Sequence, residues 1–206
     1  MTTDATRFNR STRGRVADWL RAKLAVGEFE AGDRLTEQPL AARLGIGRGP
    51  IRDALIELTK EGLLVAKPHC GVRVAPAFTP ESTRLLVQLR KQIEVFALQA
   101  GFDTIDAGVR ESLRRHLVHF RVVCEAGELA DVVQEDMHLH RIIVRLVEDG
   151  RLETVWLPII ARMRLPYSRH KTLMESYAEH ERIVEAVLAG DLPAATAALQ
   201  ANIRTR

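Results

Sequence analysis

Asp136 and His140 stand four residues apart in the run Gln-Glu-Asp-Met-His-Leu-His-Arg. In a helix this spacing places both side chains on one face, where a carboxylate and an imidazole can chelate one divalent ion, whereas His138 points elsewhere. The same spacing also suits a hydrogen bond on the surface of a helix. The pair therefore predicts a shared helix face and leaves open whether that face binds a metal.

Arg48 and Arg52 are a second pair four residues apart, near the start of another predicted helix. An arginine side chain can donate two hydrogen bonds to O6 and N7 of guanine, so a short helix with two such side chains suits the major groove of DNA. The alternative is an ordinary amphipathic helix whose arginines are solvated. The residues predicted to pack the other side of this helix are Ile51, Ala54, Leu55 and Leu58.

The elements around these arginines follow the order of a helix-turn-helix. Ser11 can cap a first helix that Gly27 ends, and Thr36 can cap a second helix. The glycine-rich residues 45–49 then lead into the arginine-bearing helix, in which Pro50 suits the first turn because its missing N–H is no loss there. Two short helices joined by a glycine turn are typical of this motif.

Two short apolar runs follow, residues 63–66 and 72–74, separated by Lys-Pro-His-Cys-Gly. They predict a small β-hairpin, which would form a wing beside the helix-turn-helix. The tip of such a wing, here His69 to Gly71, can meet the minor groove or the phosphates of DNA. The alternative is that the polar side chains of the hairpin, Lys67 included, form an ordinary solvated surface.

The composition of the 206 residues predicts a mostly α-helical protein, because helix formers are abundant and aromatic residues make up only 5%. No uncharged apolar run reaches about 18 residues and no signal-peptide core is present, so we expect a cytoplasmic protein without a membrane segment. Cys70 and Cys124 lie far apart, which argues against a disulfide scaffold or a thiolate zinc site.

Charge divides the chain into two parts. Residues 1–76 contain 13 Lys and Arg against 9 Asp and Glu, whereas residues 77–206 contain the remaining 17 and 18. We therefore expect the N-terminal part to meet any polyanion, with a winged helix-turn-helix DNA-binding domain at 1–76 and an all-α domain at 77–206. Six helices are predicted in the second domain, at residues 80–100, 105–126, 128–149, 151–165, 173–189 and 191–204, with a kink or break at Pro158.

One run in the N-terminal part carries a family resemblance: Gly-Asp-Arg-Leu-Thr-Glu-Gln-Pro-Leu-Ala-Ala-Arg-Leu-Gly-Ile-Gly-Arg-Gly-Pro-Ile-Arg-Asp-Ala-Leu. With the following Glu-Gly-Leu-Leu and the glycine hairpin, it makes residues 10–76 resemble the winged helix of GntR-family bacterial transcription regulators. The family often has Ser, Thr and Arg where this chain has Gly47, Gly49 and Gln38, and these departures bear on the operator sequence more than on DNA binding itself. The resemblance implies DNA contacts from Arg34, Gln38, Gly47, Arg48, Gly49, Arg52, His69 and Gly71.

Three motifs in the helical part carry a second resemblance: Leu-x3-Arg-x2-Ile-Glu, Asp-x2-Leu-His and Glu-His-x2-Ile-x2-Ala-Val-x2-Gly-Asp. They make residues 80–206 similar to the FCD-type effector domain of the FadR subfamily, in which an Asp and three His hold a metal below a pocket for small carboxylates. The resemblance implies metal ligation by Asp136, His140 and His180, with Asn202 at the place of the remaining histidine. Asn is a poor ligand for zinc-like ions, so water or the effector can complete the shell, or the metal can be lost.

Arg90 matches the pocket arginine of that family, so the resemblance implies a guanidinium that receives the effector carboxylate. The alternative is a solvated Arg90 or an ion pair with Glu94, four residues along. The full effector-binding set that the resemblance implies is Arg90, Asp136, His140, His180 and Asn202.

Other polar and aromatic residues of the helical part have plainer interpretations. We interpret His116 and His119 as surface residues of a charged helix, although their spacing of three could also serve a metal. Trp156 and Tyr167 can line the cavity, with core packing the favoured role of Trp156.

These features predict a ligand-responsive, dimeric transcription regulator, with repression as the family expectation. Its partners would be double-stranded DNA with a palindromic operator and a small carboxylate effector, and its cofactor a divalent metal ion such as zinc. Two alternatives remain: a metal-dependent enzyme built on the Asp and His cluster, and an architectural DNA-binding protein without an effector. We expect no enzyme, because no general base or nucleophile accompanies the cluster and the winged helix would be unexplained.

Overall fold

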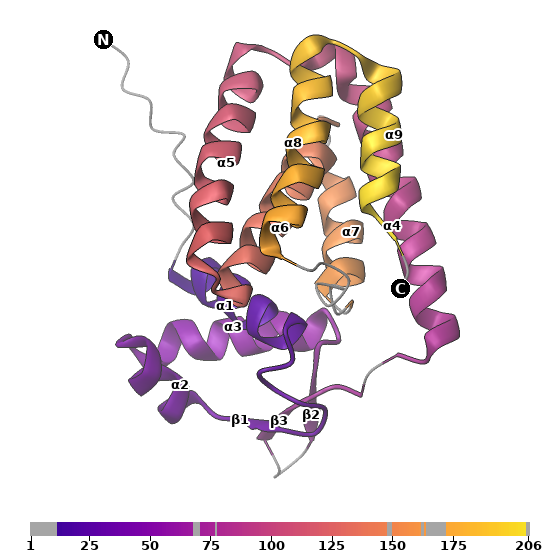
Figure 1. The fold of residues 1–206 in the computed structure, drawn as a ribbon. Helices are drawn as coiled ribbons and strands as arrows, with labels where there is room; N and C mark the ends of the chain where they lie inside the picture. Colours follow the sequence, from indigo (N-terminus) through magenta and orange to yellow (C-terminus); the bar gives the residue numbers. More distant parts are fainter. Residues whose placement is uncertain are drawn as a thin grey trace.

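A computed structural model describes residues 12–67, 71–76, 78–147, 150–161, 163 and 172–204 (Figure 1). The features predicted at Ser11, His69, Cys70 and Tyr167 lie outside these residues, as does the side chain of Lys67. The winged-helix part consists of α1 (Thr12–Ala25), β1 (Arg34–Leu35), α2 (Glu37–Leu44), α3 (Arg48–Lys60), β2 (Leu64–Lys67) and β3 (Gly71–Val74).

The helix-turn-helix forms as predicted, because the apolar side of each helix enters one core. The apolar residues predicted to pack one side of α3 are buried, with Ile51, Ala54 and Leu58 at 0% exposure. Gly45 ends α2 in the left-handed conformation at φ +64°, which a glycine adopts without the steric cost of a side chain, and so turns the chain toward α3. The arginine-bearing face of α3 is thereby left on the outside.

The wing has one more strand than the sequence predicts. The hairpin of β2 and β3 is present, with Val65 opposite Arg73, and β1 pairs antiparallel with β3, so that the strand order is β1-β3-β2. A strand of two residues, Arg34 and Leu35, shows no alternation that a sequence pattern could reveal. Its conformation is set by pairing with β3, which is far along the chain.

The helical part forms a bundle above the winged helix (Figure 1). Its elements are α4 (Pro80–Gly101), a short 3-10 turn η1 (Phe102–Thr104), α5 (Ala107–Ala126), α6 (Leu129–Val144), α7 (Arg151–Ala161), α8 (Leu173–Ala189) and α9 (Leu192–Asn202). These match the predicted helices closely, and Thr79 caps α4 as expected, its hydroxyl accepting a hydrogen bond from Ser82 N. Among the described residues, no helix combines the length and the hydropathy that a membrane crossing needs.

Two features of the bundle differ from the predictions in part. Helix α6 ends at Val144 rather than 149, and Leu146 then packs so closely on α4 that a Cβ at Gly101 would collide with it. Helix α7 runs through Pro158 as one helix, so of the kink or break predicted there the break does not occur. Trp156 and Ile160, on either side of the proline, are buried at 0% and 3% exposure, and this packing holds the helix together where local propensity would interrupt it.

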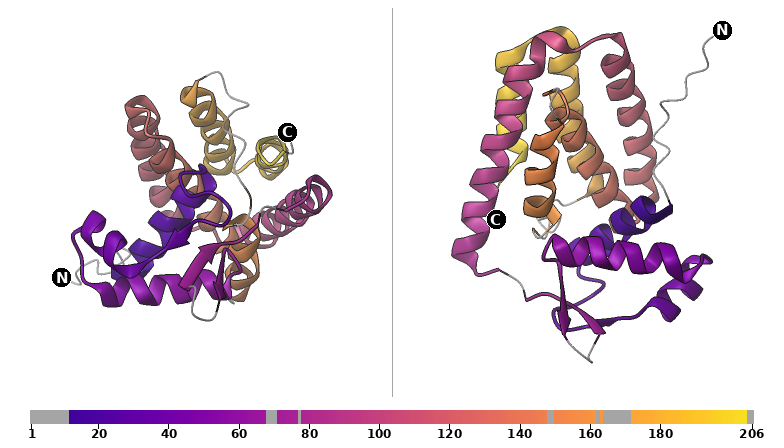
Figure 2. Two further views of the ribbon diagram at one scale, coloured as in Figure 1. Left: turned by 90° about the horizontal axis from the view of Figure 1, so that it is seen from below. Right: turned by 180° about the vertical axis from the view of Figure 1, so that it is seen from behind.

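Helix α1 lies between α3 and the bundle, as the views from two further directions show (Figure 2). Its outer face packs on α6 through small side chains, which let the two helices approach closely. The residues of this contact are Ala22, Ala25, Ala130 and Val133. The winged helix is therefore joined to the bundle by helix packing as well as by the chain that leads from β3 to α4.

Candidate functional site

The outer face of α3 presents both predicted reading residues. The side chains of Arg48 and Arg52 are 63% and 57% exposed, opposite the buried stripe. A Cβ built on Gly47 or Gly49 would meet no described atom within 4 Å, so this edge is open to an approaching backbone. Gln38 on α2 is also exposed.

Glu37, the first residue of α2, binds both arginines. Its carboxylate accepts two hydrogen bonds from Arg52, from Nε at 2.7 Å and from Nη2 at 3.0 Å, and lies 3.4 Å from Nε of Arg48. The hydrogen bonds from Arg52 lower the pKa of Glu37 to about 2. The sequence pattern identified Glu37 only as an acid in a first helical turn, because the pairing depends on how the turn brings α2 to α3.

Arg34 and Gly71 come together on the wing. Arg34 lies on β1, and its Nε would stand 3.3 Å from a Cβ at Gly71, which has a φ of +77°. Both the backbone conformation and the neighbouring guanidinium therefore favour glycine at this position. The structure thus places one cation at the base of the predicted wing tip.

Asp136, His140 and His180 are brought together in the interior of the bundle. Asp136 and His140 share one face of α6, as predicted, and His180 faces them from α8. Oδ1 of Asp136 lies 2.9 Å from Nε2 of His180 and 3.7 Å from Nε2 of His140. Burial raises the pKa of Asp136, but the two histidines outweigh burial and hold it well below its usual range.

The donor atoms of this cluster fit a divalent ion. One ligand atom from each residue lies within 4.8 Å of the others. Nε2 of His140 and Nε2 of His180 are buried beside the Asp136 carboxylate but form no hydrogen bond of good geometry among the described residues. Nδ1 of His180 donates to the carbonyl of Ser176 at 2.8 Å. Two imidazoles held by their other nitrogen, beside a carboxylate, are a common ligand set for zinc.

Glu94 supports this cluster from α4. It is fully buried and accepts hydrogen bonds from Nε of Arg90 at 2.7 Å and Nε1 of Trp156 at 2.7 Å, and its other oxygen lies 2.6 Å from Nδ1 of His140. Burial raises the pKa of Glu94, but the charges of Arg90 and His140 outweigh it and the pKa stays below its ordinary value. Glu94 therefore orients His140 so that Nε2 faces Asp136.

Arg90 forms the ion pair with Glu94 that was predicted as an alternative to effector binding. It is buried rather than solvated, at 6% exposure. Trp156 packs in the core as favoured. Asn202 is also buried, and its amide nitrogen donates to Glu179, the neighbour of His180, at 3.0 Å.

The surface assignment of His116 is wrong. This side chain is 4% exposed, and its ring centroid lies 5.4 Å from that of Phe120 and 6.3 Å from that of His180. Burial lowers its pKa to about 4. The sequence did contain a signal for this burial, because His116 occupies the same face of α5 as the apolar residues. The buried residues of α5 are Leu113, His116, Phe120 and Cys124. His119 is 62% exposed, as predicted.

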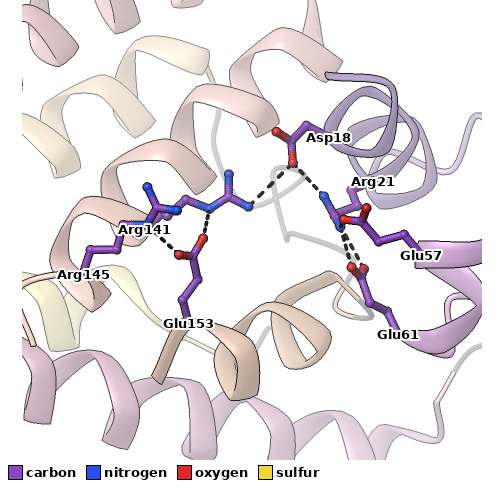
Figure 3. Close-up of polar contacts among 7 residues, drawn as sticks. All are labelled: Asp18, Arg21, Glu57, Glu61, Arg141, Arg145 and Glu153. Atoms are coloured by element: carbon purple, nitrogen blue, oxygen red, sulfur yellow. Dashed lines mark hydrogen bonds and ion pairs between the residues drawn. The ribbon is translucent and has the colours of Figure 1, made fainter. Parts of the chain in front are cut away.

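An ionic network joins α6 to α3 by way of α1 (Figure 3). Arg21 of α1 is 2% exposed and donates to Asp18 at 2.7 Å and to Glu57 of α3 at 2.8 Å, and it also binds Glu61. The same Asp18 oxygen lies 3.6 Å from Nη2 of Arg141, the residue after His140. Helix α1 thus contacts both α3, which carries Arg48 and Arg52, and α6, which carries two residues of the acid–histidine cluster.

Arg141 is itself held from the bundle side. Its Nε lies 2.9 Å from Glu153 of α7, and the other oxygen of Glu153 pairs with Arg145 (Figure 3). Arg141 and Arg145 therefore share Glu153, but of the two only Arg141 contacts Asp18 among the residues of Figure 3.

Comparison with known proteins agrees with both halves of the structure. Residues 12–74 match the family described as bacterial regulatory proteins, gntR family, and residues 85–205 match the FCD domain. The chain is 31% identical over 195 residues to an uncharacterised HTH-type transcriptional regulator of Streptomyces ambofaciens, covering 90% of this chain and 79% of the relative.

A second relative and a solved structure extend the comparison over nearly the whole length. The chain is 29% identical to a probable D-xylose utilization operon transcriptional repressor of Paenarthrobacter nicotinovorans, covering 97% of this chain and 90% of that protein. The structure of E. coli McbR/YncC shares the fold, with a TM-score of 0.72 at 18% identity over 94% of this chain and 93% of the other. The chain therefore belongs to the GntR family of bacterial transcription regulators, with an FCD domain behind its winged helix, and it is a DNA-binding regulator rather than an enzyme.

Proposed function

We propose that this regulator is a homodimeric repressor in which each winged helix reads one half of a palindromic operator and each FCD domain senses a small carboxylate. Arg48 and Arg52 would contact base edges in the major groove, since both are exposed on the outer face of α3. Gly47 and Gly49 would let the backbone approach DNA, and the exposed Gln38 would add a contact from α2. Arg34, Gly71 and His69 of the wing would meet phosphates or the minor groove.

The sensor would hold a divalent metal through Asp136, His140 and His180. The observation that carries this proposal is that two buried Nε2 atoms face one carboxylate without forming a hydrogen bond of good geometry among the described residues. A bound metal supplies a Lewis-acidic centre that attracts an anionic ligand. Water or the effector carboxylate would complete the shell in place of the missing histidine at Asn202, and Arg90 would add positive charge nearby.

The relatives support a small polar effector. Three of them are named as regulators of the D-xylose utilization operon, the gluconate operon and, as a putative assignment, the L-lactate dehydrogenase operon. Gluconate and L-lactate, which appear in the last two names, are hydroxycarboxylates. Molecules of this class can bind a metal through a carboxylate and a neighbouring hydroxyl. We therefore take hydroxycarboxylates as the first class to test.

The response would pass from the sensor to the reader along α6 and α1. Asp136 and His140 face the cluster, whereas Arg141 faces Asp18, and the face between α6 and α1 is closely packed. A ligand that binds one arrangement of α6 more tightly shifts the population toward that arrangement and so changes how α1 and α3 are held.

Zinc titration of the metal-free protein by calorimetry tests the sensor. We expect about one zinc per chain for the wild type and for His119→Ala, whose histidine is exposed, and loss of this binding for His140→Ala. Retention of a full equivalent by His140→Ala would reject the ligand set. Light scattering of the same samples tests the dimer, and a monomer at the concentrations that bind DNA would reject it.

A further inference from the structure

We propose that Glu37 and Arg52 form a single base-reading unit, in which Glu37 fixes the guanidinium so that its terminal edge faces a guanine. This inference rests on the proposed role of α3 in the major groove. It makes Glu37 a positioning residue that determines specificity without touching a base.

The two edges of the guanidinium carry the argument. A guanidinium can donate two parallel hydrogen bonds from the edge formed by Nε and Nη2, or from the edge formed by Nη1 and Nη2. Glu37 occupies the first edge of Arg52, with contacts of 2.7 Å and 3.0 Å. The second edge is the one left to bind O6 and N7 of guanine, which accept two parallel hydrogen bonds.

Arg48 differs from Arg52 in this respect. Its contact with Glu37 is one long hydrogen bond from Nε at 3.4 Å. The side chain can therefore bind either a phosphate or a base. The two arginines that the sequence pattern treats alike therefore have different roles. Arg52 is oriented before DNA binds, whereas Arg48 adapts to the DNA.

Glu37 is well placed to orient its partner. It begins α2, whose Leu40 and Ala41 are buried in the core of the winged helix, so its backbone is held by packing. The carboxylate is 25% exposed and stays ionised, because its pKa is lowered to about 2. An oriented side chain loses less conformational entropy on binding, which favours the matching base.

The carboxylate also has a cost for affinity. A negative charge on a surface that meets phosphates weakens binding to every DNA sequence, since nonspecific affinity is electrostatic. Glu37 thus lowers affinity for random DNA while it sharpens the choice of base, which is how specificity is gained against competing sites. A salt bridge that only stabilised the fold would have no such effect on sequence preference.

Selection from a random duplex library, followed by anisotropy titrations, tests the proposal. The wild type defines a preferred site, and each base pair of that site is then replaced in turn. For Glu37→Gln we expect about tenfold weaker discrimination at one guanine. We also expect about threefold tighter binding to random duplex.

Asp53→Asn is the matched control, because Asp53 is an exposed acid of α3 next to Arg52. The same change in charge should tighten binding to random duplex yet keep discrimination at every position. A double-mutant cycle adds a second criterion: in the Arg52→Ala background, Glu37→Gln should cause no further loss of discrimination, since Glu37 acts through Arg52.

The outcomes separate the inference from the function on which it rests. If the wild type selects a site and Glu37→Gln, folded by its melting curve, discriminates within twofold of it at every position, the reading unit is rejected and the role of α3 stands. If the wild type selects no sequence, both are rejected. Loss of discrimination in Asp53→Asn as well would show a general effect of charge and also overturn the proposal.

Discussion

Two of the clusters in which a glutamate holds an arginine lie in opposite surroundings. Glu37 holds Arg52 on the exposed face of α3, whereas Glu94 holds Arg90 and His140 in the interior of the bundle. In water the partners of an ion pair exchange easily and salt screens them. In the interior each charge depends on its partner, since an unpaired buried charge is costly. The exposed cluster is suited to recognising another molecule, and the buried one to holding a fixed geometry.

The sharpest way to break this comparison is to remove the same charge from each cluster. Glu94→Gln should lower the free energy of unfolding by about 3–5 kcal/mol, because a buried guanidinium loses its counter-charge. Glu37→Gln should move the melting temperature by no more than about 2 °C. Urea and thermal unfolding followed by circular dichroism measure both changes. Equal effects from the two variants would show that burial does not distinguish the clusters.

The next largest effect concerns DNA. Arg48→Ala and Arg52→Ala should each weaken binding to the selected operator by about 10- to 100-fold, since a good bidentate contact to a base contributes about 1–3 kcal/mol. Their melting temperatures should stay near that of the wild type because both side chains are exposed. If both variants bind the operator as tightly as the wild type, α3 is not part of the surface that reads DNA.

A smaller effect tests the network between the two clusters. Zinc should change the operator affinity of the wild type by about fivefold or more, the usual size of a coupling between sites. Arg141→Gln should reduce this change, because Arg141 reaches Asp18, whereas Arg145→Gln should keep it, although Arg145 pairs with the same Glu153. Identical coupling in the two variants would exclude Arg141 as the link.

The smallest expected effect is on the pKa of one carboxyl group, that of Glu37. A carboxyl with a lowered pKa contributes stability above its unfolded pKa and loses it as the pH falls through the folded value, about 2 for Glu37. The side-chain carboxyl carbon of Glu37, followed by NMR, should therefore still report the ionised form at about pH 3.5, below the ordinary glutamate pKa of about 4.3. In Arg52→Ala its midpoint should return to the ordinary range. A normal midpoint in the wild type would mean that the pair does not persist in solution.

Sequence patterns predicted what depends on local spacing. The helix-turn-helix, the buried stripe of α3 and the shared face of Asp136 and His140 follow from periods of three and four residues and from caps such as Thr79. They could not reveal β1, because a strand of two residues is defined by its partner β3.

The missed features depend on tertiary contacts. His116 looked like a surface residue because arginines and another histidine surround it in sequence, yet its helical position faces His180. Glu37 and Glu94 gained their roles only when α2 met α3 and α4 met α6. Charged residues can be placed on a helix face from sequence, but their partners come from the packing of helices.

The contact of α1 with α6 bears on how such regulators diversify. His140 and Arg141 are neighbours in sequence but project from different sides of one helix, toward the cluster and toward Asp18. Under the proposed function, substitutions around His140 would change which ligand is bound while the surface that meets α1 stays intact. By this division an ancestral gene would acquire new ligands one at a time, and an engineer would build biosensors by exchanging the residues around the cluster alone.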